Sequence, residues 1–248
     1  MQFQTLGKIV TMTAVCALAL GVGCGRQEPA EEGLVEDLSN LMPAEPAVPD
    51  SAAAAPDHTE IVHADQHVAV TRVALAPGEA VPPHPGGDRL FYSSTAGTLR
   101  VDNGAENLTF ELEPGLVVAL QPGDYGFSNV GGTEVEGLIV ARTNVPLPEV
   151  AEAPRPEPAP AGRVLFESEL ARVRKLDLEP NIGFELAPVP IRVVYAPGMV
   201  VLEYMDAAGE QYQVESAGVG VHVRPGGDRS VVNRAADPAT VVVFEFFE

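Results

Sequence analysis

Short segments in which apolar and polar residues alternate recur through most of the chain, and this period of two is typical of β-strands. The clearest examples lie at residues 98–101, 108–113, 211–214 and 219–223. The apolar run Val241–Phe244 suits a strand that is buried on both faces. Turn-forming pairs such as Pro77-Gly78 separate these segments, and neither half shows a capped helical period. The pattern therefore predicts an all-β protein, a sandwich or a barrel.

The strand pattern occurs twice along the chain. A proline-rich stretch at residues 146–162, typical of an extended linker, divides the chain into residues 58–145 and 163–248. The two parts align at an offset of 103 residues, so that Leu75 matches Leu178. With one inserted residue, Asn129 matches Asn233. A repeat of this length indicates two duplicated domains rather than the short units of a solenoid.

The N-terminus has the pattern of a secretory signal, predicted to cover residues 1–23. Its apolar run, Ile9–Val22, has 14 residues and is too short to span a bilayer. The run ends at Cys24 in a sequence that resembles the lipobox of bacterial lipoproteins, with Gly21 at a position where that pattern has a branched apolar residue. The alternative is an ordinary signal peptide with an incidental cysteine.

The lipobox resemblance implies that Cys24 is acylated and anchors the protein to a bacterial membrane, in the cell envelope. In a Gram-negative cell, the absence of Asp after the cysteine fits sorting to the outer membrane and a periplasmic location. Residues 24–57 are rich in Ala, Pro and Glu, and we expect them to form a disordered tether behind the anchor. A short helix near residues 31–41 is the alternative.

Composition excludes several functions. The chain has 15 Lys and Arg against 35 Asp and Glu, a net charge of −20, so its surface repels nucleic acid. Its two cysteines, Cys16 and Cys24, both lie in the N-terminal segment. The domains therefore offer no disulfide, no thiolate metal site and no cysteine nucleophile.

The glycines of the first half resemble the motifs of cupins, which are small jelly-roll barrels. Gly78, His84 and Gly97 fit the spacing of the first cupin motif, while Gly115 and Gly123 fit the start of the second. In the other half, Gly218, Gly226 and Asn233 keep the frame of the second motif. The resemblance implies two tandem cupin-like barrels, a bicupin.

The cupin resemblance also identifies the positions at which enzymes of the family bind a divalent metal through three imidazoles and a carboxylate. In this chain those positions hold His84, Gly86, Leu90 and Gly126 in the first half, and Ala187, Val189, Val193 and Arg229 in the second. A single imidazole does not hold a d-block metal ion against water. We therefore expect no metal and no other cofactor, with Leu90 and Val193 packed in the barrel interiors.

Four side chains are candidates for contact with a ligand. His84 is expected in a turn at the barrel mouth, either as a remnant of a metal site or as a donor to a ligand. If a small anionic ligand binds, Arg89, Arg192 and Arg229 are the cations that would meet it, but we expect Arg89 and Arg192 to face solvent or to pair with nearby carboxylates.

The sequence Pro-Gly-Gly-Asp-Arg occurs at residues 85–89 and again at residues 225–229. Successive N–H groups of such a turn can form a nest for an anion. The alternative, which we favour, is a tight turn whose Asp bonds its own backbone. Among the other polar residues, His63 and His67 are expected at the surface.

These features favour a non-catalytic module of the cell envelope, structural or binding a small molecule, a glycan or an envelope protein. One alternative is a metal-dependent cupin enzyme of dioxygenase or isomerase type, with atypical ligands such as His84 with Glu185 or Asp88. Another is a metal-free isomerase or lyase that uses Arg and Tyr. Convergence of His84 with carboxylates or imidazoles inside a barrel would favour the metal enzyme.

Overall fold

The computed structural model describes residues 50–143, 145–147, 162–216, 220–225 and 227–247. The predicted signal peptide, Cys24 and the alternative helix near residues 31–41 lie outside these ranges. Within the described residues, no helix is long and apolar enough to cross a bilayer.

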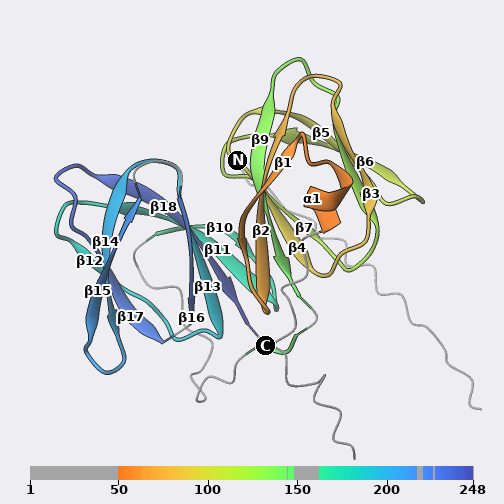
Figure 1. The fold of residues 1–248 in the computed structure, drawn as a ribbon. Coiled ribbons are helices and arrows are strands. Elements are labelled where there is room, and N and C mark those ends of the chain that lie inside the picture. Colours follow the sequence, from red (N-terminus) through yellow and green to blue (C-terminus); the bar gives the residue numbers. More distant parts are fainter. Residues whose placement is uncertain (1–49, 144, 148–161, 217–219, 226, 248) are drawn as a thin grey trace, which may run out of the picture. The chain divides into compact units, whose positions relative to one another are not determined.

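The first half forms one short helix and nine strands (Figure 1). The elements are α1 (Asp50–Ala54), β1 (Thr59–Ala64), β2 (Val68–Leu75), β3 (Ala80–His84), β4 (Arg89–Ser93), β5 (Gly97–Asp102), β6 (Asn107–Leu112), β7 (Val117–Leu120), β8 (Tyr125–Asn129) and β9 (Val135–Arg142). They build a five-stranded sheet, β1-β2-β9-β4-β7, and a four-stranded sheet, β3-β8-β5-β6, in which neighbouring strands are antiparallel.

The second half repeats this arrangement. Its strands are β10 (Arg163–Glu167), β11 (Ala171–Leu178), β12 (Gly183–Glu185), β13 (Ile191–Ala196), β14 (Val200–Asp206), β15 (Gln211–Ser216), β16 (Gly220–Pro225), β17 (Asp228–Asn233) and β18 (Ala239–Phe246). The sheets have the orders β10-β11-β18-β13-β16 and β12-β17-β14-β15, which match those of the first half strand for strand. The all-β prediction is confirmed.

The repeat extends to single hydrogen bonds. The side-chain amide of Asn129 donates to the carbonyls of Leu75 and Thr133, at 2.9 and 2.7 Å. Asn233 donates in the same way to the carbonyls of Leu178 and Asp237, at 3.0 and 2.9 Å. The asparagine of the cupin motif therefore ties the end of one sheet to the other in both barrels, and its role here is structural.

Three apolar cores hold the strands together. One fills the first barrel, one fills the second, and the third lies between the two five-stranded sheets and contains residues of both halves. Strand β13 shows the alternation that produces this arrangement: Val193 faces the shared core, whereas Val194 faces the interior of the second barrel. The central strands of both five-stranded sheets, such as β4 and β13, are thus buried on two faces.

The shared core corrects one expectation. Leu90 and Val193 do not fill the barrel interiors; both lie in the core between the barrels. Because side chains alternate along a strand, the interior positions belong to their neighbours, Arg89 and Arg192.

Residues 50–57 were expected to belong to a disordered tether, and this part of the prediction is wrong. Helix α1 packs at the first barrel, where Ala55 is buried in its apolar core. Ser51 lies 3.4 Å from the buried hydroxyl of Thr71, and the Thr59 hydroxyl donates to the carbonyl of Ala55 at 2.7 Å. Alanine and serine are small enough to fit where a larger side chain would not, which explains why a segment of low hydrophobicity is ordered here.

Candidate functional site

His84 occupies the interior of the first barrel rather than a surface turn. It ends strand β3, is 4% exposed, and tilts against the ring of Phe127. Its Nε2 lies 3.1 Å from Nη1 of Arg89, and its Nδ1 lies 2.9 Å from the carbonyl of Pro82. A guanidinium can only donate, so Nε2 accepts from Arg89 and Nδ1 carries the proton that is donated to Pro82.

Arg89 is held just as firmly. It is 3% exposed, donates to the carbonyl of Gly123 at 2.7 Å, and lies over the ring of Tyr125. The expectation that it faces solvent is therefore wrong, since its guanidinium points into the barrel.

The first barrel does not fit the metal that the cupin resemblance would imply. The one retained ligand, His84, directs Nε2 at a guanidinium, and a cation at that distance repels a metal ion. Glu185 is exposed on β12 of the other barrel, and Asp88 lies among the residues that line a pocket outside the barrel interior. No group of three or more metal-binding side chains converges within the described ranges.

The interior of the second barrel carries a row of charges across four neighbouring strands. Arg172 on β11 pairs in register with Glu245 on β18, Glu245 pairs with Arg192 on β13, and Arg192 pairs with Arg224 on β16. Side chains in register lie on the same face of a sheet, about 5 Å apart at their Cβ atoms. The row thus reads positive, negative, positive, positive.

Most of these cations have a carboxylate of their own. Arg172 binds Glu167 at 2.8 Å and Arg174, also on β11, binds Glu245 at 2.6 Å. Arg224 pairs with the buried carboxylate of Asp228 at 3.2 Å.

Arg192 is different. It is fully buried, and its closest carboxylate is Glu245, at 3.8 Å and already bonded to Arg174. Its Nη2 donates to the carbonyl of Ala187, but its Nε and Nη1 have no hydrogen-bond partner among the described residues. Burial lowers the pKa of Arg192, yet an arginine starts so far above neutrality that it stays charged.

Two further donors near Arg192 lack an acceptor in the part of the chain that the structure describes. These are Nε of Arg174 and the hydroxyl of Tyr204, which is fully buried. Burial raises the pKa of the Tyr204 phenol, so the hydroxyl stays protonated and can donate at neutral pH. Oε2 of Glu245 is an unpartnered acceptor beside them, but the unpartnered donors of Arg192, Arg174 and Tyr204 outnumber it. An excess of buried donors is the environment that an anion requires.

The aromatic rings of Tyr212 and Tyr204 lie next to Arg224, at one side of this cluster of donors. The guanidinium of Arg224 lies 3.9 Å from the ring centre of Tyr212, which stacks on Tyr204. The side chain of Arg224 is 26% exposed, whereas Arg192 is fully buried, so Arg224 is the arginine of the row that meets solvent. His222 lies on the same strand as Arg224, and burial together with the charge of Arg224 lowers the pKa of His222.

The remaining candidate residues separate in space. Arg192 lies inside the second barrel and Arg89 inside the first, while Arg229 is exposed and its backbone carbonyl accepts a hydrogen bond from Leu186. In the second Pro-Gly-Gly-Asp-Arg segment, the carboxylate of Asp228 accepts a hydrogen bond from Nε of Arg224 at 3.2 Å.

The sequence contains a signal for Arg172 and Arg174, two residues of the charged row that were not among the candidates. In the segment Ala171–Leu178, Arg172 and Arg174 are in phase with Leu176 and Leu178, which are core residues of the second barrel. Charged residues on the apolar face of a strand are uncommon, and this phase marks them as interior.

The chain has the fold of two tandem cupin-like jelly-roll barrels. No family model matches the sequence, and no curated protein does. Among solved structures, the chain is similar to oxalate decarboxylase from Bacillus subtilis, with 14% identity, a TM-score of 0.56, and coverage of 74% of this chain and 70% of that one.

Two other solved structures have the same fold. AerE from Microcystis aeruginosa has 11% identity and a TM-score of 0.56 over 77% of this chain and 94% of that one. Oxalate decarboxylase from Lactobacillus farciminis, solved as a formate complex, has 14% identity and a TM-score of 0.54 over 73% and 77%. At these identities the likeness shows the fold alone, and it agrees with two cupin-like jelly-roll barrels in one chain.

Proposed function

We propose that this protein is a cell-envelope lipoprotein whose second barrel binds a small carboxylate anion without a metal. The anchor would be the acylated Cys24 behind a signal peptide, as the apolar run and the lipobox-like sequence suggest. The barrel would then present its ligand site outside the cytoplasm, with residues 25–49 as the connection to the membrane.

The observation that carries the proposal is the state of Arg192. A fully buried guanidinium with two N–H positions unsatisfied is costly, because its lost hydration is not replaced. Glu245 cannot neutralise Arg192 and Arg174 together. An anion bound beside Arg192 and the Tyr204 hydroxyl would supply both the missing charge and the missing acceptors.

Carboxylates are the favoured class of anion for two reasons. The flat guanidinium matches a carboxylate geometrically. In addition, two structures of the same fold are named for carboxylate chemistry, since one is an oxalate decarboxylase and another such enzyme is a formate complex.

The competing proposal is a metal-dependent enzyme centred on His84. The contact between Nε2 of His84 and Arg89 argues against it, because the lone pair that a metal would need already accepts a hydrogen bond. We therefore favour a binding role over catalysis.

The test is calorimetric titration of the purified full-length protein with oxalate, formate, acetate and inorganic phosphate. At least one carboxylate should bind, and Arg192→Met should weaken that binding at least about tenfold. Arg234→Met is the matched control, because Arg234 pairs with Glu203 at the surface. Binding that survives Arg192→Met, or no binding up to about 10 mM, would contradict the proposal.

Elemental analysis tests the competing function on the same preparation. The protein is dialysed against manganese, iron, nickel and zinc salts and then freed of excess metal. Metal close to one equivalent per chain, lost in His84→Ala, would favour the enzyme.

A further inference from the structure

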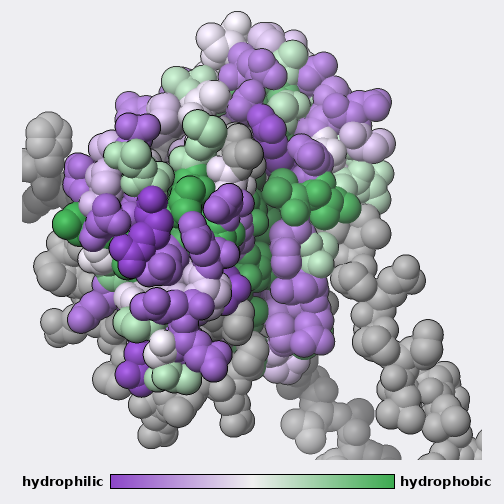
Figure 2. Space-filling model, turned by 60° about the vertical axis from the view of Figure 1, so that its left-hand side comes forward, coloured by the Kyte–Doolittle hydropathy of each residue, from purple (hydrophilic) through white to green (hydrophobic). Residues whose placement is uncertain are grey.

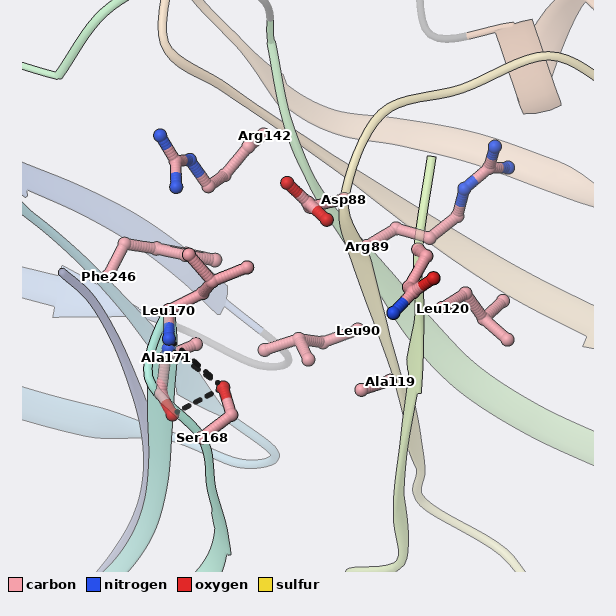
Figure 3. A pocket seen from close by; sticks show the side chains of 11 residues that line it. Asp88, Arg89, Leu90, Ala119, Leu120, Arg142, Ser168, Leu170, Ala171 and Phe246 are labelled. Atoms are coloured by element: carbon pink, nitrogen blue, oxygen red, sulfur yellow. Dashed lines mark hydrogen bonds between the residues drawn. The ribbon is translucent and has the colours of Figure 1, made fainter. Parts of the chain in front are cut away.

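Hydrophobic residues gather in a strip on one face of a mostly hydrophilic surface, as Figure 2 shows. A separate observation is a pocket of about 230 Å³ formed by residues of both halves (Figure 3). Its lining combines apolar side chains, among them Leu90, Leu170 and Phe246, with the charged residues Asp88 and Arg142. It lies outside the interior of the second barrel, so the anion site proposed above does not account for it.

The body of the pocket is apolar. Leu90 and Leu120 come from the first barrel, while Leu170 and Phe246 come from the second. Leu170 is 42% exposed, although the other three side chains are buried. An exposed leucine beside buried apolar side chains is a surface that an apolar group of a ligand would cover.

Two opposite charges stand at the rim of this pocket. The backbone N–H of Arg142 donates to the carbonyl of Asp88 at 2.9 Å, which fixes the two residues side by side. Their side chains lie on the same side of the pocket in Figure 3. Neither side chain makes a hydrogen bond or an ion pair with another described residue, and they do not pair with each other.

Among the other polar residues of the lining, Gln121 carries no charge, and Ser168 and Arg89 are engaged or turned away. The Ser168 hydroxyl bonds the backbone of Leu170 and Ala171, and the Arg89 guanidinium points into the first barrel, as Figure 3 shows. Asp88 and Arg142 are therefore the charges that a ligand in the pocket would meet.

We propose that this pocket binds a free α-amino acid with an aliphatic or aromatic side chain. Arg142 would hold the carboxylate, Asp88 would hold the ammonium group, and the apolar side chain would lie against Leu90, Leu170 and Phe246. The volume supports a ligand of this size, because it is below the roughly 300–1,000 Å³ of pockets that hold drug-sized molecules. A simple apolar acid would be repelled by Asp88, and a simple apolar amine by Arg142.

The experiment compares three compounds by calorimetric titration of the full-length protein: L-leucine, 4-methylpentanoate, which lacks the ammonium group, and 3-methylbutylamine, which lacks the carboxylate. Leucine should bind, and the two others should bind at least about tenfold more weakly. Arg142→Met and Asp88→Asn should each weaken leucine binding at least about tenfold. Asp88→Asn should in addition strengthen the binding of 4-methylpentanoate, because it removes the repelling charge.

Arg100→Met is the control, since Arg100 is an exposed arginine on β5 and does not line the pocket. Unchanged thermal melting of the variants would show that they fold, which we expect because neither rim side chain has a side-chain partner among the described residues. Equal binding of leucine and 4-methylpentanoate, no binding of leucine or phenylalanine, or full binding by Arg142→Met would overturn the proposal. Titration with oxalate and formate reports on the Arg192 site, whereas leucine binding that depends on Arg142 and Asp88 reports on this pocket, so the two proposed sites can fail separately.

Discussion

Glu245 is the carboxylate on which the charge row of the second barrel depends, and its removal gives the sharpest test of that arrangement. It is fully buried and lies 2.6 Å from Arg174, 3.8 Å from Arg192 and 4.0 Å from Arg172. At an effective dielectric constant of about 20, each attraction is roughly 4–6 kcal/mol before the cost of desolvation is subtracted. Glu245→Gln keeps the shape and removes the charge.

We expect Glu245→Gln to lower the free energy of unfolding by about 3–5 kcal/mol, the range found when one partner of a buried ion pair is removed. For a protein of this size, that corresponds to a fall in Tm of roughly 6–20 °C. The assay is thermal unfolding followed by far-ultraviolet circular dichroism. Glu136→Gln is the control: its pair with Arg72 spans 3.6 Å between side chains that are 37% and 39% exposed, and its loss should cost less than about 1 kcal/mol.

The same variant makes a second, opposite prediction for binding. Without Glu245, the positive charge around Arg192 is less compensated, so the carboxylate that binds the wild-type protein should bind the variant more tightly and raise its Tm more. Two results would show that the charge row lacks the energetic role assigned to it. One is a Tm of Glu245→Gln equal to that of Glu136→Gln. The other is that added carboxylate raises the Tm of Glu245→Gln no more than it raises that of the wild type.

Three further predictions concern the fold. Ala55→Glu should destabilise the first barrel by at least about 2 kcal/mol, because Ala55 is buried in its core, whereas Ala53→Glu on the exposed face of α1 should be neutral in thermal melts. Asn129→Ala and Asn233→Ala should each cost about 2–4 kcal/mol in urea unfolding, since each leaves two carbonyls without their donor, and unequal losses would contradict equivalent roles. Because the pKa of His222 is lowered in the folded protein, the unfolded chain binds a proton at this residue at a higher pH than the folded chain does. The stability of the fold should therefore fall as the pH is lowered from 7.5 to 5. His222→Gln should reduce the change of Tm over this range.

The architecture could be predicted because its signals are local. Alternation marks the strands, and the glycines of the cupin motif occupy backbone conformations that other residues avoid, with φ of 86° at Gly78 and 94° at Gly115. The side chains that face each interior could not be assigned in the same way. In β4 and β13 both faces are buried, so the apolar pattern does not distinguish the barrel interior from the core between the barrels, and Leu90 was assigned to the wrong side.

The candidate site depended on register, which no local pattern contains. Arg172, Glu245 and Arg192 become neighbours only because β18 pairs with both β11 and β13. Arg192 was singled out from the sequence for its charge, but its burial and its shared carboxylate follow from that pairing. The ordered α1 was missed because small residues contribute little hydrophobicity, although they fit closely against a core that is already formed.

The two barrels show how a duplicated fold can separate structure from chemistry. Both keep the same strand order and the same asparagine tie, so the backbone requirements of the fold are met twice. Their interiors differ in charge balance. In the first barrel the guanidinium of Arg89 has acceptors in His84 and the carbonyl of Gly123, whereas in the second Nε and Nη1 of Arg192 have no acceptor among the described residues. A ligand adds few hydrogen bonds to a buried site whose donors are already satisfied, but it adds the missing hydrogen bonds to a site whose donors are not. We therefore expect ligand binding in the second barrel and not in the first.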